Sequence, residues 1–209
     1  MIARHALACC FVLLLLAPAP SLAQSIGVRG YAAFGVVQLA AKDTFEAVAD
    51  TSQRSTFGGG VQVTNIWKGI FADLSVFTMS LDGERVFVDN GEVFKLAIPL
   101  EIKMRPIDVA GGWRLNYGRV SPYVGAGATF LNYEESTEGD AATEPVSESK
   151  AGALVLGGVD VALWSVVHVG GELRYRHVTG ILGAAGASAE FGEDNAGGLA
   201  AAVRVSIGR

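Results

Sequence analysis

The sequence predicts an all-β protein: a single eight-stranded antiparallel β-barrel that crosses a membrane. Three observations lead to this expectation. Apolar and polar residues alternate with a period of two in eight segments, as in strands with two different faces. Short and long connections alternate between these segments, and small residues crowd the more polar face. The length of 209 residues fits one domain.

Composition narrows the classes of function. Half of the residues are hydrophobic, 27 are Gly, and the formal net charge is −5. A chain this apolar can bury enough surface to fold, which disfavours disorder. The isoelectric point of about 5.2, without any cluster of Lys or Arg, disfavours nucleic acid as a partner.

Residues 1–23 are predicted to be a secretory signal peptide, and residues 24–209 the barrel domain. A basic start precedes an apolar run over residues 6–17, and the small residues Ser21 and Ala23 end the segment. The apolar run is shorter than the roughly 20 residues that span a bilayer as a helix, although a membrane anchor is the alternative. Both cysteines lie in this segment. We therefore expect an exported domain without disulfides, Cys-ligated zinc or thiol chemistry.

The first three alternating segments cover residues 28–36, 57–64 and 70–76. In each of them the residues on one face are apolar or small, whereas Arg29 and Asp73 lie on the opposite face. This alternation predicts strands with one polar and one apolar surface.

The fourth segment, residues 100–115, changes parity. Its apolar residues are even-numbered up to Met104 and odd-numbered from Ile107, and the charged residues change with them. A slip of one residue turns every side chain to the other face, so the sequence predicts a β-bulge near Pro106.

The last four segments cover residues 123–130, 155–163, 169–176 and 199–207. With one register chosen for each segment, and the bulge included, every charge in the eight segments falls on one face. These charges are predicted to line the lumen as a network: Arg29, Asp73, Glu101, Lys103, Arg105, Asp108, Arg114, Asp160, Glu172, Arg174, Arg176 and Arg204.

Two closed architectures fit this pattern, a soluble barrel with an apolar interior and a membrane barrel with a polar one. Small residues such as Gly58, Gly158 and Gly170 share the charged registers. Because the interior of an eight-stranded barrel is only just wide enough for side chains, long charged residues need small neighbours there. This favours the membrane barrel over a soluble periplasmic ligand-binding barrel.

The connections and tryptophans support the same choice. Long connections over about 41–55, 81–98, 134–150 and 178–196 alternate with short turns. Membrane barrels have short periplasmic turns and long external loops. Trp67, Trp113 and Trp164 all lie at or beside the short turns, which predicts a periplasmic aromatic girdle.

Several motifs resemble those of a known family. They are Gly112–Leu115, Ser121–Ala128, Gly157–Val161, Gly170–Arg176 and the closing segment Gly197–Arg209. On these motifs the chain resembles the small outer-membrane β-barrel proteins of Gram-negative bacteria, the OmpA-like and opacity-protein-like group. The resemblance implies an outer-membrane location, contact with lipid and lipopolysaccharide, and insertion by the barrel assembly machinery. The assembly signal of that family ends in an aromatic residue, whereas this sequence ends in Arg209.

Two functions remain open for the barrel. In the first, paired charges close the lumen of a non-enzymatic protein that has a structural or surface-interaction role. In the second, the lumen is a narrow porin-like channel in which Lys103, Arg105, Arg174 and Arg176 favour anions.

The long connections add candidate interaction surfaces. One is acidic, and it could meet an extracellular partner or a divalent cation; its acids are Glu134, Glu135, Glu138, Asp140, Glu144 and Glu148. Another reads as a hairpin around Asn90–Gly91 that extends above the membrane as a possible adhesive edge. His168 and His177 have no spacing that identifies a nucleophile and base, and no metal or cofactor motif occurs. We expect no enzyme, metal or cofactor.

Overall fold

The computed structural model describes residues 26–89, 92–137, 146–183 and 186–209. The predicted signal peptide lies outside these residues. Eight strands form one closed antiparallel barrel in which each strand pairs with its neighbours in sequence and β1 pairs with β8. The strands are β1 (Gly27–Leu39), β2 (Gln53–Thr64), β3 (Ile70–Asp89), β4 (Glu92–Arg114), β5 (Val120–Thr137), β6 (Val146–Ala162), β7 (Val167–His177) and β8 (Gly198–Gly208). The predicted fold class is confirmed.

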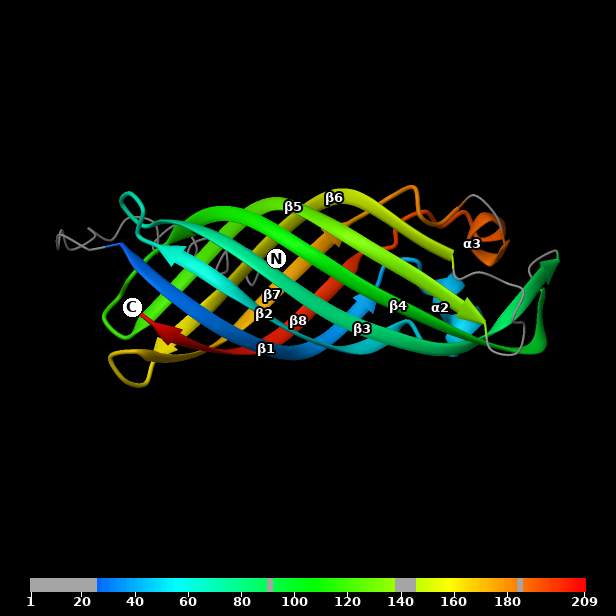
Figure 1. Ribbon diagram of the computed structural model, residues 1–209, viewed down its shortest axis with the longest axis horizontal. Coiled ribbons are helices and arrows are strands. Elements are labelled where there is room, and N and C mark those ends of the chain that lie inside the picture. Colours follow the sequence, from blue (N-terminus) through cyan, green and yellow to red (C-terminus); the bar gives the residue numbers. More distant parts are fainter. Residues whose placement is uncertain (1–25, 90–91, 138–145, 184–185) are drawn as a thin grey trace, which may run out of the picture.

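The two ends of the barrel differ. Short turns and the C-terminus lie at one end, whereas the other end carries the helices α2 (Lys42–Ala49) and α3 (Gly186–Glu190) and the tip of the β3–β4 hairpin (Figure 1). Neither helix has the length and hydropathy that crossing a membrane requires, and the other described residues form no such helix. We call the two ends the short-turn end and the loop end.

The barrel wall extends farther towards the loop end on one side than on the other. Strand β4 has 23 residues and β3 has 20, whereas β7 and β8 have 11 each. A tilted strand needs about 9–11 residues to cross a bilayer. The loop-end parts of β3 and β4 therefore stand above the membrane.

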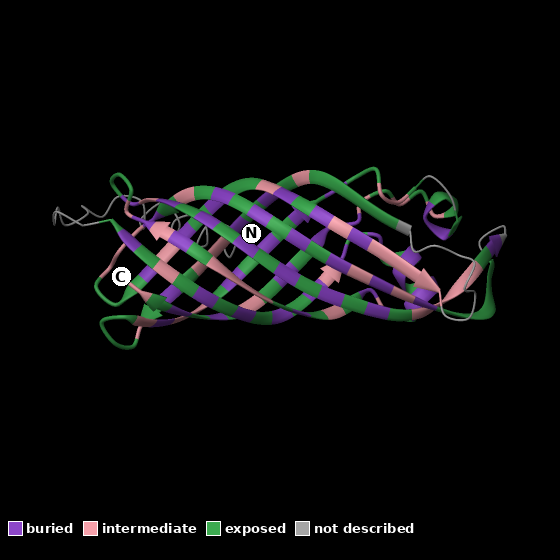
Figure 2. Ribbon diagram, viewed as in Figure 1, coloured by how far each residue is buried: buried purple, intermediate pink, exposed green. Residues whose placement is uncertain are grey.

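Buried and exposed residues alternate along the strands (Figure 2). Towards the short-turn end the outward side chains are apolar and exposed, as lipid contact requires. They include Val28, Phe34, Phe57, Val61, Leu74, Val109, Val124, Val155, Leu173, Val203 and Ile207.

The interior changes character along the barrel axis. The section near the short-turn end holds buried charged side chains, whereas the section near the loop end holds an apolar cluster, which we call the outer core. Its members are Val37, Leu39, Ala41, Phe45, Val48, Ala49, Met79, Leu81, Leu100, Ile102, Met104, Leu131, Tyr133, Val178, Ala196 and Ala200. Because three of these residues belong to α2, the first long connection folds into the barrel mouth.

The expected β-bulge near Pro106 is wrong. Strand β4 pairs with β5 in one unbroken register from Leu100 to Arg114. On the other side of β4, the pairs Met104–Met79 and Ile107–Val76 also share one register. The same alternate residues of β4 face inwards on both sides of Pro106, and what changes along the strand is the environment that the two faces meet.

Glu101, Lys103 and Arg105 therefore face outwards, not into the lumen. Glu101 and Lys103 form an ion pair of 2.9 Å, and their side chains are 39% and 43% exposed. Met104, between Lys103 and Arg105, is fully buried in the outer core. Above the bilayer the outer face meets water and the inner face meets apolar side chains, so the pattern inverts without a bulge.

The pairing does shift farther up, between Glu84 and Val86 of β3. Opposite this shift, Ala97 of β4 has a left-handed φ of 54°. An irregularity of this kind bends a strand pair. It separates the barrel wall from the outer part of the β3–β4 hairpin, whose predicted turn at Asn90–Gly91 lies outside the described residues.

Candidate functional site

The lumen near the short-turn end holds the densest polar chemistry of the described residues. Nine of the twelve charges expected there line it, from six different strands. They are Arg29, Asp73, Asp108, Arg114, Asp160, Glu172, Arg174, Arg176 and Arg204. Eight of them are buried and Arg29 is partly exposed. We call this set the lumenal network.

Arg174 lies at its centre. Its guanidinium donates hydrogen bonds to Glu172 (2.5 Å), Ser75 (2.7 Å), Tyr31 (2.7 Å), Asp108 (2.9 Å) and Asp73 (3.3 Å). Three of these acceptors are carboxylates from β3, β4 and β7. One cation thus joins strands from opposite sides of the barrel.

Further pairs extend the network in both directions. Towards the loop end, Arg176 donates to Asp108 at 2.7 Å. Towards the short-turn end, Arg204 donates to Glu172 at 2.9 Å and Arg114 to Asp160 at 2.8 Å. Charges taken out of water require such pairing, because an unpaired buried charge is strongly unfavourable.

Neutral side chains also belong to the network, and a prediction based on charged residues alone did not include them. Tyr123 donates to Glu172 at 2.8 Å, and Gln62 accepts from Arg114 at 2.6 Å. The guanidinium carbon of Arg204 lies 4.0 Å from the ring centre of Tyr31. Strand parity already places these three side chains on the lumenal face, so parity was the signal that could have identified them.

Lumenal glycines make room for these groups. A Cβ atom at Gly158 would lie 2.5 Å from the Tyr123 hydroxyl, and one at Gly170 would lie 2.4 Å from an Asp160 carboxylate oxygen. Real Cβ atoms do not approach other atoms so closely. These close approaches explain why small residues share the charged face of the strands, as the sequence suggested.

The outer core covers the network on the loop side. Helix α2 packs against β3 so closely that a Cβ at Gly83 would lie 2.3 Å from the Val48 carbonyl oxygen. The N-terminus of α2 has no side-chain cap of its own. Instead, Glu193 from the last long connection accepts hydrogen bonds from the amides of Asp43 (3.1 Å) and Thr44 (2.8 Å).

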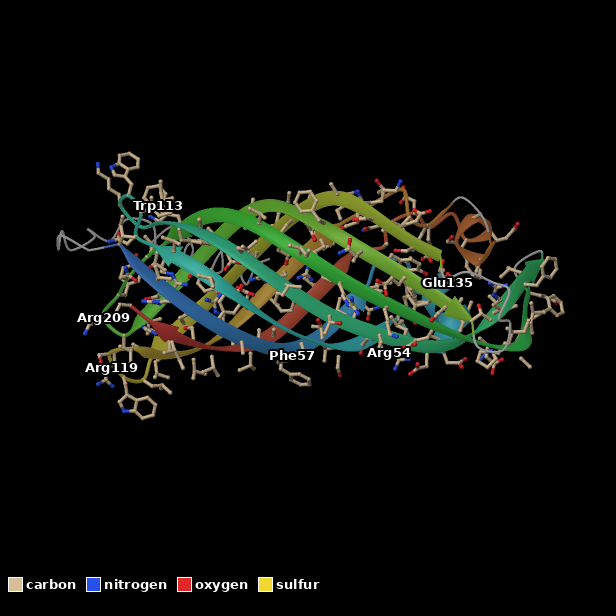
Figure 3. All side chains as sticks on the ribbon, viewed as in Figure 1. Arg54, Phe57, Trp113, Arg119, Glu135 and Arg209 are labelled. Carbon is tan, nitrogen blue, oxygen red and sulfur yellow. The ribbon has the colours of Figure 1, made fainter. Side chains whose placement is uncertain are left out.

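The three tryptophans lie at the short-turn end, where Figure 3 labels Trp113. Trp67, Trp113 and Trp164 are 62%, 50% and 68% exposed. Their role as an interfacial girdle stays a prediction.

The other sequence candidates are scattered. His168 is buried near the short-turn end and His177 is exposed. In the acidic connection, Glu138, Asp140 and Glu144 lie outside the described residues. Within the described residues, no three His, Cys, Asp or Glu side chains gather as a metal site.

A closed barrel with an apolar outer belt and a charged interior defines an integral membrane β-barrel protein. A family model described as "Outer membrane protein beta-barrel domain" matches residues 9–205. The chain belongs to this family, and it is an outer-membrane protein with short periplasmic turns and long external loops. No curated protein matches the sequence.

Solved structures show the same fold at low sequence identity. The N-terminal β-barrel domain of Pseudomonas aeruginosa OprF matches with a TM-score of 0.51 at 11% identity, covering 87% of this chain and 97% of that one. Neisserial surface protein A gives 0.52 at 14%, with coverages of 87% and 96%. A major outer membrane protein from Thermus thermophilus gives 0.58 at 10%, with coverages of 89% and 100%.

Proposed function

We propose that the protein is a non-enzymatic outer-membrane protein that presents the β3–β4 hairpin at the cell surface, on a barrel closed to solutes. The hairpin carries the interaction, and the barrel anchors it. The partner meets the hairpin through apolar contact.

The exposed apolar side chains of the hairpin carry this proposal. They are Phe87, Val93, Phe94, Leu96 and Ile98, which are 38–58% exposed. In the aqueous region outside the bilayer, a group of exposed apolar side chains is typical of an interaction site. The rings of Phe87 and Phe94 lie 6.5 Å apart, so they form one continuous apolar surface across the two strands.

The hairpin is also tied to the barrel mouth. Lys95 forms an ion pair of 2.6 Å with Asp50, the C-cap residue of α2. The hydrogen bond to Asp50 raises the pKa of Lys95 above its usual value. This exposed ion pair links the hairpin to the barrel mouth, and a surface that is ordered before binding loses less entropy on binding.

The closed lumen supports an anchoring role over transport. The lumenal network fills one section of the interior with paired charges, and the outer core fills the next with apolar side chains. A water-filled path would have to displace both. Passive conduction of small solutes is the competing function, and planar-bilayer conductance of the refolded protein distinguishes them.

Cell adhesion tests the surface role. We expect that cells displaying the protein attach to apolar-coated surfaces more strongly than cells without it, and that the double substitution Phe87→Ser and Phe94→Ser abolishes the difference. Phe191→Ser is the matched control, because Phe191 lies at the same end but outside the hairpin. Equal attachment of the hairpin variant and the wild-type protein, at equal surface amounts, would refute the proposal.

A further inference from the structure

A pocket of about 460 Å³ opens at the loop end, outside the lumenal network. It lies between α2, the connection that contains α3, and the high wall formed by β3, β4 and β5. Its volume falls within the roughly 300–1,000 Å³ of small-molecule sites. Figure 3 labels Glu135, one of its lining residues, near this end of the barrel.

The inner wall of the pocket is apolar. Phe45, Val48, Leu100 and Ile102 line it, and each is at most 9% exposed. These residues belong to the outer core, so their positions are fixed by packing. Leu182, from the connection after β7, closes another side. An apolar wall held in this way favours an apolar ligand body.

Two polar groups of the pocket have no partner among the described residues. The hydroxyl oxygen of Thr44 is buried and makes no hydrogen bond. Buried polar atoms are normally satisfied, so this hydroxyl calls for a bound water or a ligand. Arg85 forms no ion pair with any residue that the structure describes, although it lines the same pocket.

The remaining charge in the lining is Glu135. One of its carboxylate oxygens accepts a hydrogen bond of 3.3 Å from the Tyr133 hydroxyl. Because the tyrosine hydroxyl is neutral, Glu135 keeps its negative charge, but one of its oxygens already has a donor. Arg85 has no ion-pair partner among the described residues. This asymmetry favours an anionic head over a cationic one.

We propose that this pocket binds a small amphipathic anion, an organic acid with a short apolar chain, from the medium outside the cell. Its carboxylate pairs with Arg85, its chain lies against Phe45 and Ile102, and the Thr44 hydroxyl donates to the head group. This site shares Leu96 with the apolar surface of the hairpin but includes neither Phe87 nor Phe94, so its test does not depend on the adhesion experiment.

Methyl NMR of the full chain in lipid nanodiscs tests the proposal with three probes of equal chain length: octanoate, 1-octanol and octylamine. We expect saturable octanoate shifts at the methyls of Thr44, Val48 and Ile102. The lipid-facing methyls of Leu173 and Val203 report partition into the bilayer, which does not saturate. Octanoate binds roughly tenfold or more tightly than octylamine, as one charge-assisted contact predicts.

Variants identify the groups responsible. Arg85→Gln weakens octanoate binding by roughly tenfold and leaves octanol unchanged, because it removes only the charge. Glu135→Gln strengthens octanoate binding, because it removes a like charge. Arg54→Gln, a cation at the same end but outside the pocket, changes neither. Octylamine binding as tightly as octanoate, shifts confined to lipid-facing methyls, or full octanoate affinity in Arg85→Gln would each overturn the proposal.

Discussion

Replacing Arg174 with Met removes the guanidinium that joins three lumenal carboxylates. Asp73, Asp108 and Glu172 would each lose a charged donor while remaining buried. Breaking a buried ion pair by removing one partner costs about 3–5 kcal/mol, because it leaves a charge without compensation. Since this cation serves three carboxylates, we expect a loss at the upper end of that range or beyond it.

Urea unfolding in lipid vesicles measures this loss, with tryptophan fluorescence as one signal and gel mobility of the folded form as another. The matched control is Arg105→Met, which removes the same group from the outer face of β4. We expect the control to change the free energy of unfolding by at most about 0.5 kcal/mol. Equal losses in Arg174→Met and Arg105→Met would refute the placement of the two side chains and the argument built on it.

Three further predictions concern the sterics, the mouth and the lumen. Gly158→Ala would place a methyl group against the Tyr123 hydroxyl, and we expect it to lower the free energy of unfolding by about 1–3 kcal/mol in the same assay. The control is Gly171→Ala, whose added methyl group would meet nothing within 4 Å, and we expect it to fold like the wild-type protein. Glu193→Ala should speed hydrogen exchange of the amides in the first turn of α2, since losing a cap costs about 0.5–2 kcal/mol. The control Glu190→Ala should leave this exchange unchanged. Equal exchange rates in the two variants would contradict the capping role of Glu193. Planar-bilayer conductance of the refolded protein should stay at background, and a reproducible open level would show that the lumen conducts.

Strand parity explains how much of this structure the sequence could predict. Each alternating segment became a strand, and the parity of seven segments assigned their inward and outward faces as the structure has them. Alternation works there because lipid and lumen impose opposite demands on neighbouring residues. Which carboxylate meets Arg174 could not be predicted, since its carboxylate partners lie as many as 101 residues away in sequence and depend on how the barrel closes.

The segment around Pro106 shows where parity fails. A change of parity has two possible causes, a slipped strand or a change in what surrounds an unslipped one, and both leave the same pattern of letters. The second cause holds here because the buried residues of α2, such as Phe45, fill the mouth with apolar side chains. A helix in a connection has no fixed position relative to a strand until the chain folds, so the sequence did not reveal what Met104 would meet.

The inversion near Pro106 also limits vertical movement of the barrel in its membrane. A shift of the barrel by two residues along β4 is a shift of about 7 Å. In one direction it would bring Arg105 into the hydrocarbon of the bilayer, and in the other direction it would expose Ile107 to water. A basic side chain on the lipid face costs roughly 2–4 kcal/mol at the bilayer midplane and less towards its edges. Neighbouring strands would be displaced with β4, because all eight are joined in a closed sheet. In a membrane of different thickness, we therefore expect the lipid to thin or thicken around this protein while its depth stays constant.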